Sequence, residues 1–429
     1  MSENFSAFQG CAHFMTFHAL GLIDPLLRNL EALGYRRPTP VQVQAIPAVL
    51  AGRDLMAAAQ TGTGKTASFA VPLLQRLTMN GPQVTANSVH VLVLVPTREL
   101  AEQVYESFLA YGASLPLRSF VAYGGVSIEP QKNKLRKGLD VLVATPGRLL
   151  DLYAQQAVKF DQLQTLVLDE ADRMLDLGFS RELEAVFAAL PKQRQTLLFS
   201  ATFSDAIRAL ARELLAEPLS IQVSARNSTV KNVKQSMIAV DKKRKLDLFC
   251  HLLKVRRWGQ VLVFVKTRKG VDQLAAALRA QGIRADSIHG DKTQPARLRA
   301  LERFKSAEVQ VLVASDVAAR GLDIDNLAHV VNFDLPTVAE DYIHRIGRTG
   351  RAGASGEAVS LVCADEVDLL SAVETLTKQL LRRVEEPGFE AAHRVPITGA
   401  GAAAKKKPAH DAKNGAARPS KRRFYGSRT

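Results

Sequence analysis

Three carboxylates follow one apolar segment near the middle of the chain. The segment "LVLDEADRML", residues 166 to 175, begins as a buried strand and then places Asp169 and Glu170 side by side, with Asp172 two residues further on. Adjacent carboxylates at the end of a strand can hold a divalent cation through one group and polarise a water molecule through the other. Taken alone, such a pair is more often a favourable charge in the first turn of a helix. Other residues must decide between the two interpretations.

A glycine-rich loop far upstream of these acids favours the chemical interpretation. The loop "AQTGTGKT", residues 59 to 66, follows an apolar strand and precedes a helical segment. Gly62 and Gly64 let backbone N–H groups surround a phosphate at the start of that helix. Lys65 can then reach the outer phosphates, and Thr66 can hold Mg²⁺. The strict pattern has glycine at the position of Ala59, and a glycine-rich turn with an incidental lysine is the alternative interpretation.

Together, the loop and the acids predict a nucleotide-hydrolysing site. In phosphate-loop proteins an aspartate at the end of a neighbouring strand holds Mg²⁺, and the next acid can polarise the attacking water. We therefore assign the first role to Asp169 and the second to Glu170.

The elements that must position these residues are short apolar strands alternating with helices. Strands are predicted at residues 53–59, 89–96, 139–146, 163–170, 195–202, 260–267, 309–316, 328–336 and 357–363. Because they are apolar on both faces, they fit parallel sheets covered by helices. Ligands of such sheets bind beyond the carboxyl ends of the strands, where these segments end in polar or small residues. The polar stretch 224–241 separates the strands into two groups, so we expect a linker there between two α/β domains.

Composition and charge restrict the class of protein. A chain of 429 residues that is 47% hydrophobic suits two domains, and a net charge of +15 favours a polyanionic partner. Cys11, Cys250 and Cys363 lack metal-type spacing, which argues against a disulfide framework or zinc site and for a reducing compartment. No apolar run reaches the roughly 18 residues of a membrane span, so we expect a cytoplasmic protein without membrane contact.

The end of the chain is strongly basic. Residues 398–429 contain nine Lys or Arg residues and one acid, Asp411, which gives this tail a net charge of +8. It has almost no aliphatic side chain larger than alanine and cannot offset its own ordering entropy. We predict that this tail is disordered.

The motifs and their order resemble the DEAD-box family of ATP-dependent RNA helicases over about residues 17–365. The matching segments are "AQTGTGKT", "PTREL" (96–100), "TPGR" (145–148), "DEAD" (169–172), "SAT" (200–202), "SDVAARGLD" (315–323) and "HRIGRTGR" (344–351). Within the family, "GYRRPTPVQ" (34–42) and the spacing of "HGDKTQPAR" (289–297) look closest to the bacterial RhlE subgroup. The resemblance implies two RecA-like domains in tandem, with boundaries at 15–223 and 242–385. It leaves out residues 1–14 and the tail, 386–429.

The resemblance also implies roles for the nucleotide-binding residues. Gln42 resembles the glutamine that reads adenine, Tyr35 would stack on the base, and Phe17 would support this motif. An amide can donate to N7 and accept from the amino group of adenine, although alone it would more simply be a polar residue that begins a helix. The phosphate loop contributes Thr61, Gly62, Thr63, Gly64, Lys65 and Thr66, and Asp323 resembles a residue that touches the ribose.

Other motifs resemble those that join the two domains. Arg348 and Arg351 resemble arginine fingers that the second domain donates to the γ-phosphate, and such fingers contribute roughly 10³ to 10⁵ in rate. His344 resembles the residue that links this motif to the DEAD acids. Ser200 and Thr202 resemble the pair that couples hydrolysis to strand separation, although small hydroxyl residues closing a strand would explain them equally well.

The family's RNA contacts map onto small residues and arginines, which suit recognition of phosphates and 2′-hydroxyls. The matching residues are Thr97, Arg98, Gly124, Gly125, Thr145 and Arg148 in the first domain and Thr267, Arg268, Ser315 and Gly321 in the second.

The resemblance therefore implies an RNA-dependent ATPase that uses ATP and Mg²⁺ and locally unwinds short duplexes. Ribosomal or RNA-decay proteins are conceivable partners. Two alternatives stay open at this point: a DNA translocase, which could share the phosphate loop and arginine fingers, and a non-enzymatic RNA chaperone that binds through the tail. Met15 directly precedes the segment where the resemblance begins, and we expect it to be an alternative start of translation.

Overall fold

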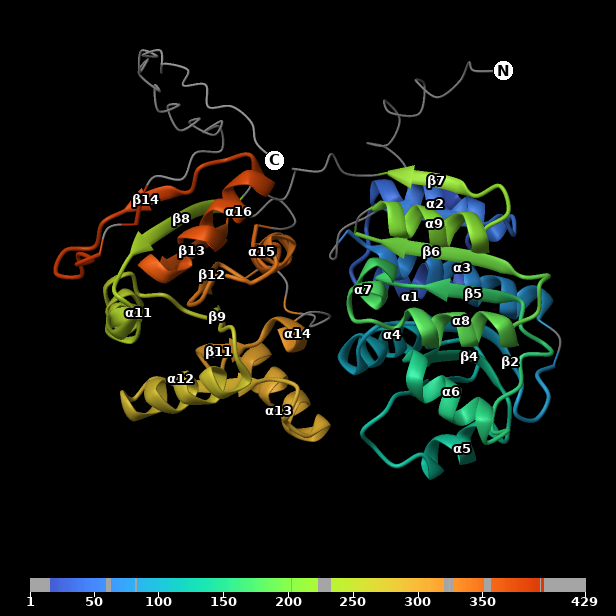
Figure 1. The fold of residues 1–429 in the computed structure, drawn as a ribbon. Helices are drawn as coiled ribbons and strands as arrows, with labels where there is room; N and C mark the ends of the chain where they lie inside the picture. The colour runs from blue at the N-terminus through green and yellow to red at the C-terminus, as the bar shows by residue number, and fades with distance from the viewer. Residues whose placement is uncertain are drawn as a thin grey trace, which may run out of the picture.

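The computed structural model describes residues 16–58, 63–81, 83–201, 203–222, 233–319, 324, 327–350, 356–393 and 395–396. Within these ranges the chain forms two α/β lobes, one built by the first half of the sequence and one by the second (Figure 1). The predicted N-terminal extension, the proposed start at Met15 and the basic stretch 398–429 lie outside the described residues. No helix in the described part of the chain is long and apolar enough to cross a membrane.

The first lobe is centred on a parallel sheet with the strand order β3-β4-β2-β5-β6-β1-β7. Its strands are β1 (Leu55–Ala58), β2 (Val89–Leu94), β3 (Ser119–Ala122), β4 (Leu139–Ala144), β5 (Thr165–Leu168), β6 (Gln195–Ser200) and β7 (Leu219–Gln222). Helices α1 (Asp24–Ala32), α2 (Pro40–Leu50), α3 (Lys65–Asn80) and α4 (Arg98–Tyr111), with the short η1 (Phe17–Leu20), pack on one face. Helices α5 (Glu129–Leu135), α6 (Pro146–Ala154), α7 (Ala171–Asp176), α8 (Ser180–Ala189) and α9 (Asp205–Leu214) contribute to the core on the other.

The second lobe repeats this plan with the strand order β10-β11-β9-β12-β13-β8-β14. Its strands are β8 (Val233–Ala239), β9 (Val261–Phe264), β10 (Ala285–Ile288), β11 (Val311–Ala314), β12 (His329–Asn332), β13 (Gly356–Val362) and β14 (Arg382–Val384). Helices α11 (Lys245–Val255) and α12 (Arg268–Ala280) cover one face, after the short η2 (Lys242–Arg244). Helices α13 (Gln294–Lys305), α14 (Asp316–Ala319), α15 (Ala339–Ile346) and α16 (Val367–Thr377), with η3 (Ala364–Glu366), lie on the other.

The predicted fold class is confirmed, since both sheets are parallel and flanked by helices. Each of the nine predicted strands is present. The linker prediction is wrong at its C-terminal end, because residues 233–239 form β8, which pairs with β13 and β14 inside the second sheet. The polar side chains of Lys234 and Gln235 misled the prediction. They lie near the start of β8, where the strand is less deeply buried than at Met237.

Parallel strand order brings the predicted motifs to one edge of each sheet. In the first lobe the phosphate loop follows β1, Thr97 follows β2, Thr145 follows β4 and Asp169 follows β5. Thr97 and Thr145 are the N-cap residues of α4 and α6 and have extended backbone conformations. In the second lobe Thr267 follows β9 and caps α12 in the same way, its hydroxyl accepting a hydrogen bond from Gly270 N. Residues from distant parts of the sequence are thus gathered at the carboxyl ends of the strands.

A buried ion cluster ties three elements of the second lobe together. Lys245, at the start of α11, is 2% exposed, and its Nζ lies 2.7 Å from Glu366 Oε2 and 2.7 Å from Phe333 O. Asp334 Oδ1 lies 3.4 Å from the same nitrogen. Burial alone would raise the pKa of Glu366, but the charge of Lys245 and the hydrogen bonds to the carboxylate outweigh it and hold that pKa below its ordinary value.

Replacing Lys245 with alanine should destabilise the second lobe by about 3–5 kcal/mol, because Glu366 would remain buried without its cation. The one tryptophan of the chain, Trp258, is buried in this lobe, so its fluorescence during urea unfolding reports the change directly. The matched control is Lys242→Ala, which breaks an exposed ion pair with Asp365 at 3.9 Å and should leave the urea midpoint unchanged.

The pH dependence provides a second test of this cluster. A carboxylate whose folded-state pKa is lowered stabilises the fold above its ordinary pKa, and that contribution disappears as the pH falls through the lowered value. The difference between the Lys245→Ala variant and the unmodified chain should therefore shrink in acid. Equal midpoints at neutral pH would contradict the assigned role of Lys245.

Candidate functional site

The phosphate loop leads directly into a buried ion pair. Gly64 has a φ of 86° and caps α3, whose first residue is Lys65. The Nζ atom of Lys65 lies 3.7 Å from Asp169 Oδ1, and the two side chains are 5% and 3% exposed. Among the described residues this ammonium group has no hydrogen-bond partner, so it is available to a phosphate. The structure thus brings together the loop and the acid that the sequence predicted to cooperate.

Asp169 is buried, and Lys65 is the cation that lies beside it. Burial raises the pKa of this carboxyl to about 6, although Lys65 acts in the opposite direction and Glu170 adds to the increase. A buried carboxylate with a single neighbouring cation fits the ligand set of Mg²⁺, which prefers one or two carboxylates together with substrate phosphates. Thr66 follows Lys65 in the first turn of α3 and carries a hydroxyl, which is a further oxygen ligand of the kind that Mg²⁺ prefers. These residues fit the predicted metal ion.

Glu170 has a strained backbone. Its φ of 54° and ψ of 51° place it in the left-handed region, which few residues other than glycine adopt. Its N–H donates to Asp169 Oδ1 at 2.9 Å, and it caps α7. Such strain persists only where the surrounding structure enforces it, and it is concentrated at functional sites. The backbone therefore turns sharply at Glu170, between the end of β5 and the start of α7.

The third acid of the motif connects it to the "SAT" segment, a role that sequence reasoning missed. Asp172 Oδ2 accepts a hydrogen bond from Ala201 N at 3.0 Å, and its Oδ1 accepts one from Arg173 N. Ser200 is fully buried at the end of β6, beside Ala58 at the end of β1. The signal in the sequence was a carboxylate two residues after Glu170 together with a small residue at Ala201.

The predicted adenine-reading residues lie next to the phosphate loop. Gln42 is fully buried in the first turn of α2, and its Nε2 donates to Gly64 O at 3.1 Å. Its Oε1 accepts a hydrogen bond from Thr39 N at 2.8 Å. A side chain at Gly64 would overlap this amide, so the close approach requires glycine. Tyr35 is half-buried, and its ring makes a near-perpendicular contact with that of Phe17 at 6.2 Å.

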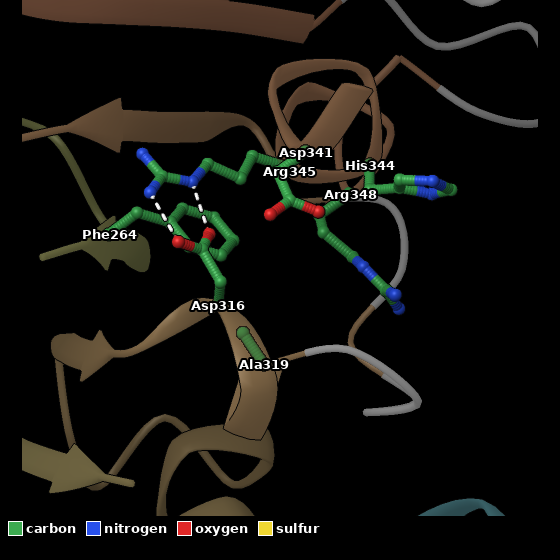
Figure 2. A pocket seen from close by; sticks show the side chains of 7 residues that line it. All are labelled: Phe264, Asp316, Ala319, Asp341, His344, Arg345 and Arg348. Carbon is green, nitrogen blue, oxygen red and sulfur yellow. Dashed lines mark hydrogen bonds and ion pairs between the residues drawn. The ribbon is translucent and has the colours of Figure 1, made fainter. Parts of the chain in front are cut away.

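The arginines of "HRIGRTGR" have different roles. Arg345 is 2% exposed, and its guanidinium binds both carboxylate oxygens of Asp316, at 2.5 and 2.8 Å. It also donates to Asn332 and to Asp334 O, so it is fully used within the second lobe. Figure 2 shows His344 and Arg348 extending from the end of α15 away from the Arg345–Asp316 pair. The structure therefore separates a structural arginine from a candidate finger.

The predicted RNA contacts of the first lobe form two adjacent groups. The Thr97 hydroxyl accepts from Leu100 N at 3.3 Å, and a side chain at Gly125, whose φ is 80°, would overlap the guanidinium of Arg98. Gly124 lies beside the same guanidinium. Arg148 donates to Val126 O at 3.0 Å, which connects the helix after Thr145 to the loop of the glycine pair.

The predicted RNA contacts of the second lobe lie at the ends of β9 and β11. Arg268, the first residue of α12, pairs with Asp291 at 2.5 Å, and both side chains are about 60% exposed. Ser315 is buried directly after β11, and its N–H donates to Ile288 O. Six residues of the predicted site lie outside the described residues: Thr61, Gly62, Thr202, Gly321, Asp323 and Arg351.

One ion pair joins the two lobes and was not foreseen from the sequence. Arg297 on α13 places its Nη2 2.9 Å from Oε2 of Glu99, in the first turn of α4, and both side chains are nearly buried. Burial lowers the pKa of Arg297, and the charge of Glu99 acts against that decrease. Glu99 directly follows Arg98, so the contact between the lobes lies beside a predicted RNA-binding residue.

The fold and the site define a two-lobed phosphate-loop enzyme, and comparisons with known proteins identify its family. Residues 39–210 match the family model of the DEAD/DEAH box helicase, and residues 244–353 match that of the helicase conserved C-terminal domain. The DEAD-box ATP-dependent RNA helicase CshA of Geobacillus kaustophilus is 42% identical over 377 residues, which are 88% of this chain and 80% of that protein. The chain belongs to the DEAD-box helicases. It is an ATP-dependent RNA helicase that uses ATP and Mg²⁺ and acts on RNA.

Solved structures of one relative are similar to this chain over most of its length. S. cerevisiae Dbp5 bound to RNA and ADP BeF3 is 32% identical and superposes with a TM-score of 0.75, covering 86% of this chain and 95% of that chain. A Dbp5 variant bound to Nup159, Gle1, IP6 and ADP, which is 31% identical and covers 86% and 96%, gives 0.60. The chain thus shares the two-lobed fold of Dbp5.

Substituting Gly125 with alanine should weaken RNA binding. The new methyl group would overlap the Arg98 guanidinium and force it away, at a position where the backbone itself disfavours a side chain. Because a hydrogen bond to a charged group contributes about 1.5–3 kcal/mol, the RNA concentration for half-maximal ATPase should rise by about 10-fold or more. Gly259→Ala, where a side chain meets no atom within 4 Å, is the control. Equal RNA dependence of both variants would remove Arg98 from the RNA site.

Proposed function

We propose that hydrolysis in this helicase is carried out by the groups around Asp169. The observation that supports this assignment is the buried Lys65–Asp169 pair, with the strained Glu170 beside it and Asp172 bonded to Ala201. Lys65 binds the outer phosphates, and Thr66 and Asp169 hold Mg²⁺, which when bound offsets the negative charge that develops on the phosphates. Glu170 accepts a proton from the attacking water and holds it in line.

The base and ribose of ATP are assigned to neighbouring groups. Gln42 reads the adenine edge, Tyr35 stacks on the ring, and Phe17 supports Tyr35. Asp323 contacts the ribose, and the remaining loop residues, Thr61, Gly62, Thr63 and Gly64, cradle the phosphates. The contact between Gln42 and Gly64 supports a shared binding site for base and phosphates.

The second lobe completes the site when it closes on the first. Arg348 and Arg351 approach the γ-phosphate, and His344 connects them to the DEAD acids. Arg348 and His344 extend away from the structural Arg345, which supports this assignment (Figure 2). Ser200 and Thr202 transmit closure to the RNA contacts, and Asp172 adds a direct link between the acids and that segment.

RNA is bound across both lobes by the residues at the ends of the strands. In the first lobe these are Thr97, Arg98, Gly124, Gly125, Thr145 and Arg148. In the second lobe they are Thr267, Arg268, Ser315 and Gly321. The ion pair between Glu99 and Arg297 supports a continuous path, because it holds α13 beside the RNA-binding start of α4.

Four finer assignments are also proposals. The segment "GYRRPTPVQ" and the spacing of "HGDKTQPAR" are the features that favour the RhlE subgroup. The relative described above carries the name CshA. The net charge, the cysteine usage and the absence of a long apolar run in the sequence support a cytoplasmic protein. The proposed domain boundaries are residues 15–223 for the first lobe and 242–385 for the second. Strand β8 extends the second lobe to residue 233, and Phe389 and Val395, which pack against its core, extend it beyond residue 385. Ribosomal or RNA-decay proteins are the proposed partners.

Replacing Glu170 with glutamine should reduce ATP turnover by about 10² to 10⁴ while ATP and RNA still bind, because the amide keeps the shape but cannot take the proton. Single-turnover ATPase and RNA affinity in the presence of ATP measure the two effects. Glu184→Gln, which removes the same charge from an exposed position on α8, is the control. Turnover near that of the control would exclude Glu170 from the reaction.

We further propose that the basic tail, residues 398–429, tethers RNA. Its net charge of +8 and the pair Phe424 and Tyr425 among arginines support binding of phosphates and stacking on bases. Removing the tail should weaken RNA binding and reduce the log–log salt slope by about 3, as expected for roughly four phosphates. The ATPase rate at saturating RNA should remain close to that of the full chain. An unchanged affinity and slope would show that the tail does not bind RNA, and a collapsed saturated rate would place it in the catalytic mechanism.

A further inference from the structure

A tyrosine on the RNA-binding helix α4 contacts the side chain assigned to the base of ATP. The hydroxyl oxygens of Tyr35 and Tyr111 lie 2.8 Å apart, and either group can donate the hydrogen bond. The two rings meet near-perpendicularly, with centroids 5.8 Å apart and an interplanar angle of 86°. This contact crosses from the loop after α1 to the last turn of α4.

Tyr111 is held firmly, whereas Tyr35 lies in a loop. Tyr111 is 6% exposed, and its backbone oxygen accepts a hydrogen bond from Asn29 Nδ2 at 2.7 Å. Tyr35 follows Gly34, which has a φ of 82°, and it precedes the exposed Arg36 and Arg37. The backbone of Tyr35 is fixed by a bond from its N–H to Leu30 O at 2.9 Å, but this bond does not fix the ring.

The hydroxyl contact supplies the constraint that the loop lacks. A hydrogen bond at the far end of a tyrosine ring restricts the first side-chain torsion, because rotation about the Cα–Cβ bond moves the hydroxyl oxygen. The near-perpendicular contact with the ring of Tyr111 limits rotation about the second torsion, which leaves that oxygen in place. A ring that is already oriented loses less entropy when a base stacks on it. Without the bond, the contact with Phe17 at 6.2 Å would still bury the ring but would leave the direction of its Cβ–Cγ axis less restricted.

We propose that Tyr111 is a positioning residue for the base of ATP, acting through its hydroxyl on Tyr35. This inference rests on the proposed function, in which Tyr35 stacks on adenine. Tyr111 does not touch the nucleotide in this scheme. Through this hydrogen bond it connects Tyr35 to the C-terminal end of helix α4, whose N-terminal end contains Arg98 and Glu99.

A double-mutant cycle in the full-length chain tests the inference. Tyr111→Phe and Tyr35→Phe each remove one hydroxyl and keep the ring. Each should weaken ADP binding in calorimetry and raise KM for ATP by about 2- to 10-fold, the usual effect of one neutral hydrogen bond. The double variant should be no weaker than either single variant, because all three lose the same bond. For Tyr111→Phe the kcat at saturating ATP and RNA should not change, whereas a merely structural role would alter thermal stability and leave KM unchanged.

Two further variants separate failure of this inference from failure of the proposed nucleotide site. Tyr105→Phe removes a hydroxyl from the same helix at a ring that packs against Phe120, and it should leave ADP affinity unchanged. Tyr35→Ala should weaken ADP binding more than Tyr35→Phe. If Tyr35→Ala has no effect on ADP affinity, the assignment of Tyr35 to the base is wrong, and the inference fails with it. If Tyr35→Ala weakens binding and Tyr111→Phe does not, or if the two phenylalanine variants are additive, only the role of Tyr111 is overturned.

Discussion

The buried carboxylate of Asp169 is the constraint on which the first lobe's site depends. It lies at the end of β5, held by a hydrogen bond from its N–H to Leu94 O, with Lys65 as the neighbouring cation. Removing this charge from water is costly unless cations surround it, and its pKa is raised to about 6 as a result. The site is therefore electrostatically incomplete without further positive charge. In the proposed function, magnesium would supply part of that charge, and Arg348 and Arg351 of the second lobe would supply more when the lobes close.

The second lobe contributes those arginines from a helix end that is itself fixed by an arginine. Arg345 lies in the last turn of α15, and Arg348 follows the C-cap residue Gly347. Arg345 is bound to Asp316, Asn332 and Asp334. This network locks the end of α15 against the carboxyl ends of β11 and β12. A finger needs accurate placement, since its contribution depends on meeting charge only in the transition state. The structural arginine thus provides the accuracy that the candidate finger requires.

The sequence predicted the centre of each sheet better than its edges. Central strands such as β2 and β11 are apolar on both faces and were recognised, whereas four of the five missed strands, β3, β7, β10 and β14, lie at sheet edges. Edge strands are short and half-exposed, so their composition resembles that of loops. The fifth, β8, carries polar side chains although it is an interior strand.

The same limit applies to the site. Motif residues were predicted because spacing along the chain reveals them, but the contacts between motifs were not. The pairs Asp172–Ala201 and Glu99–Arg297 join residues far apart in the sequence. Nothing in the run of charges distinguishes Arg345 from Arg348 either, since only the fold shows that Arg345 binds Asp316.

The hydrogen bonds of Gln42 show how base recognition and phosphate binding are joined. A side-chain amide has two N–H donors and two acceptor lone pairs. In this structure one donor is used by Gly64 O and one acceptor position by Thr39 N. One donor and one acceptor remain, which is the combination that N7 and the amino group of adenine require.

Gln42 can therefore read the base without releasing the loop, although its full burial means that neighbouring groups must move when the nucleotide enters. A base that cannot satisfy both remaining positions leaves a buried polar atom unpaired next to Gly64. If Gln42 reads the base as proposed, the penalty for the wrong nucleotide falls on the residue that also contacts Gly64 of the phosphate loop.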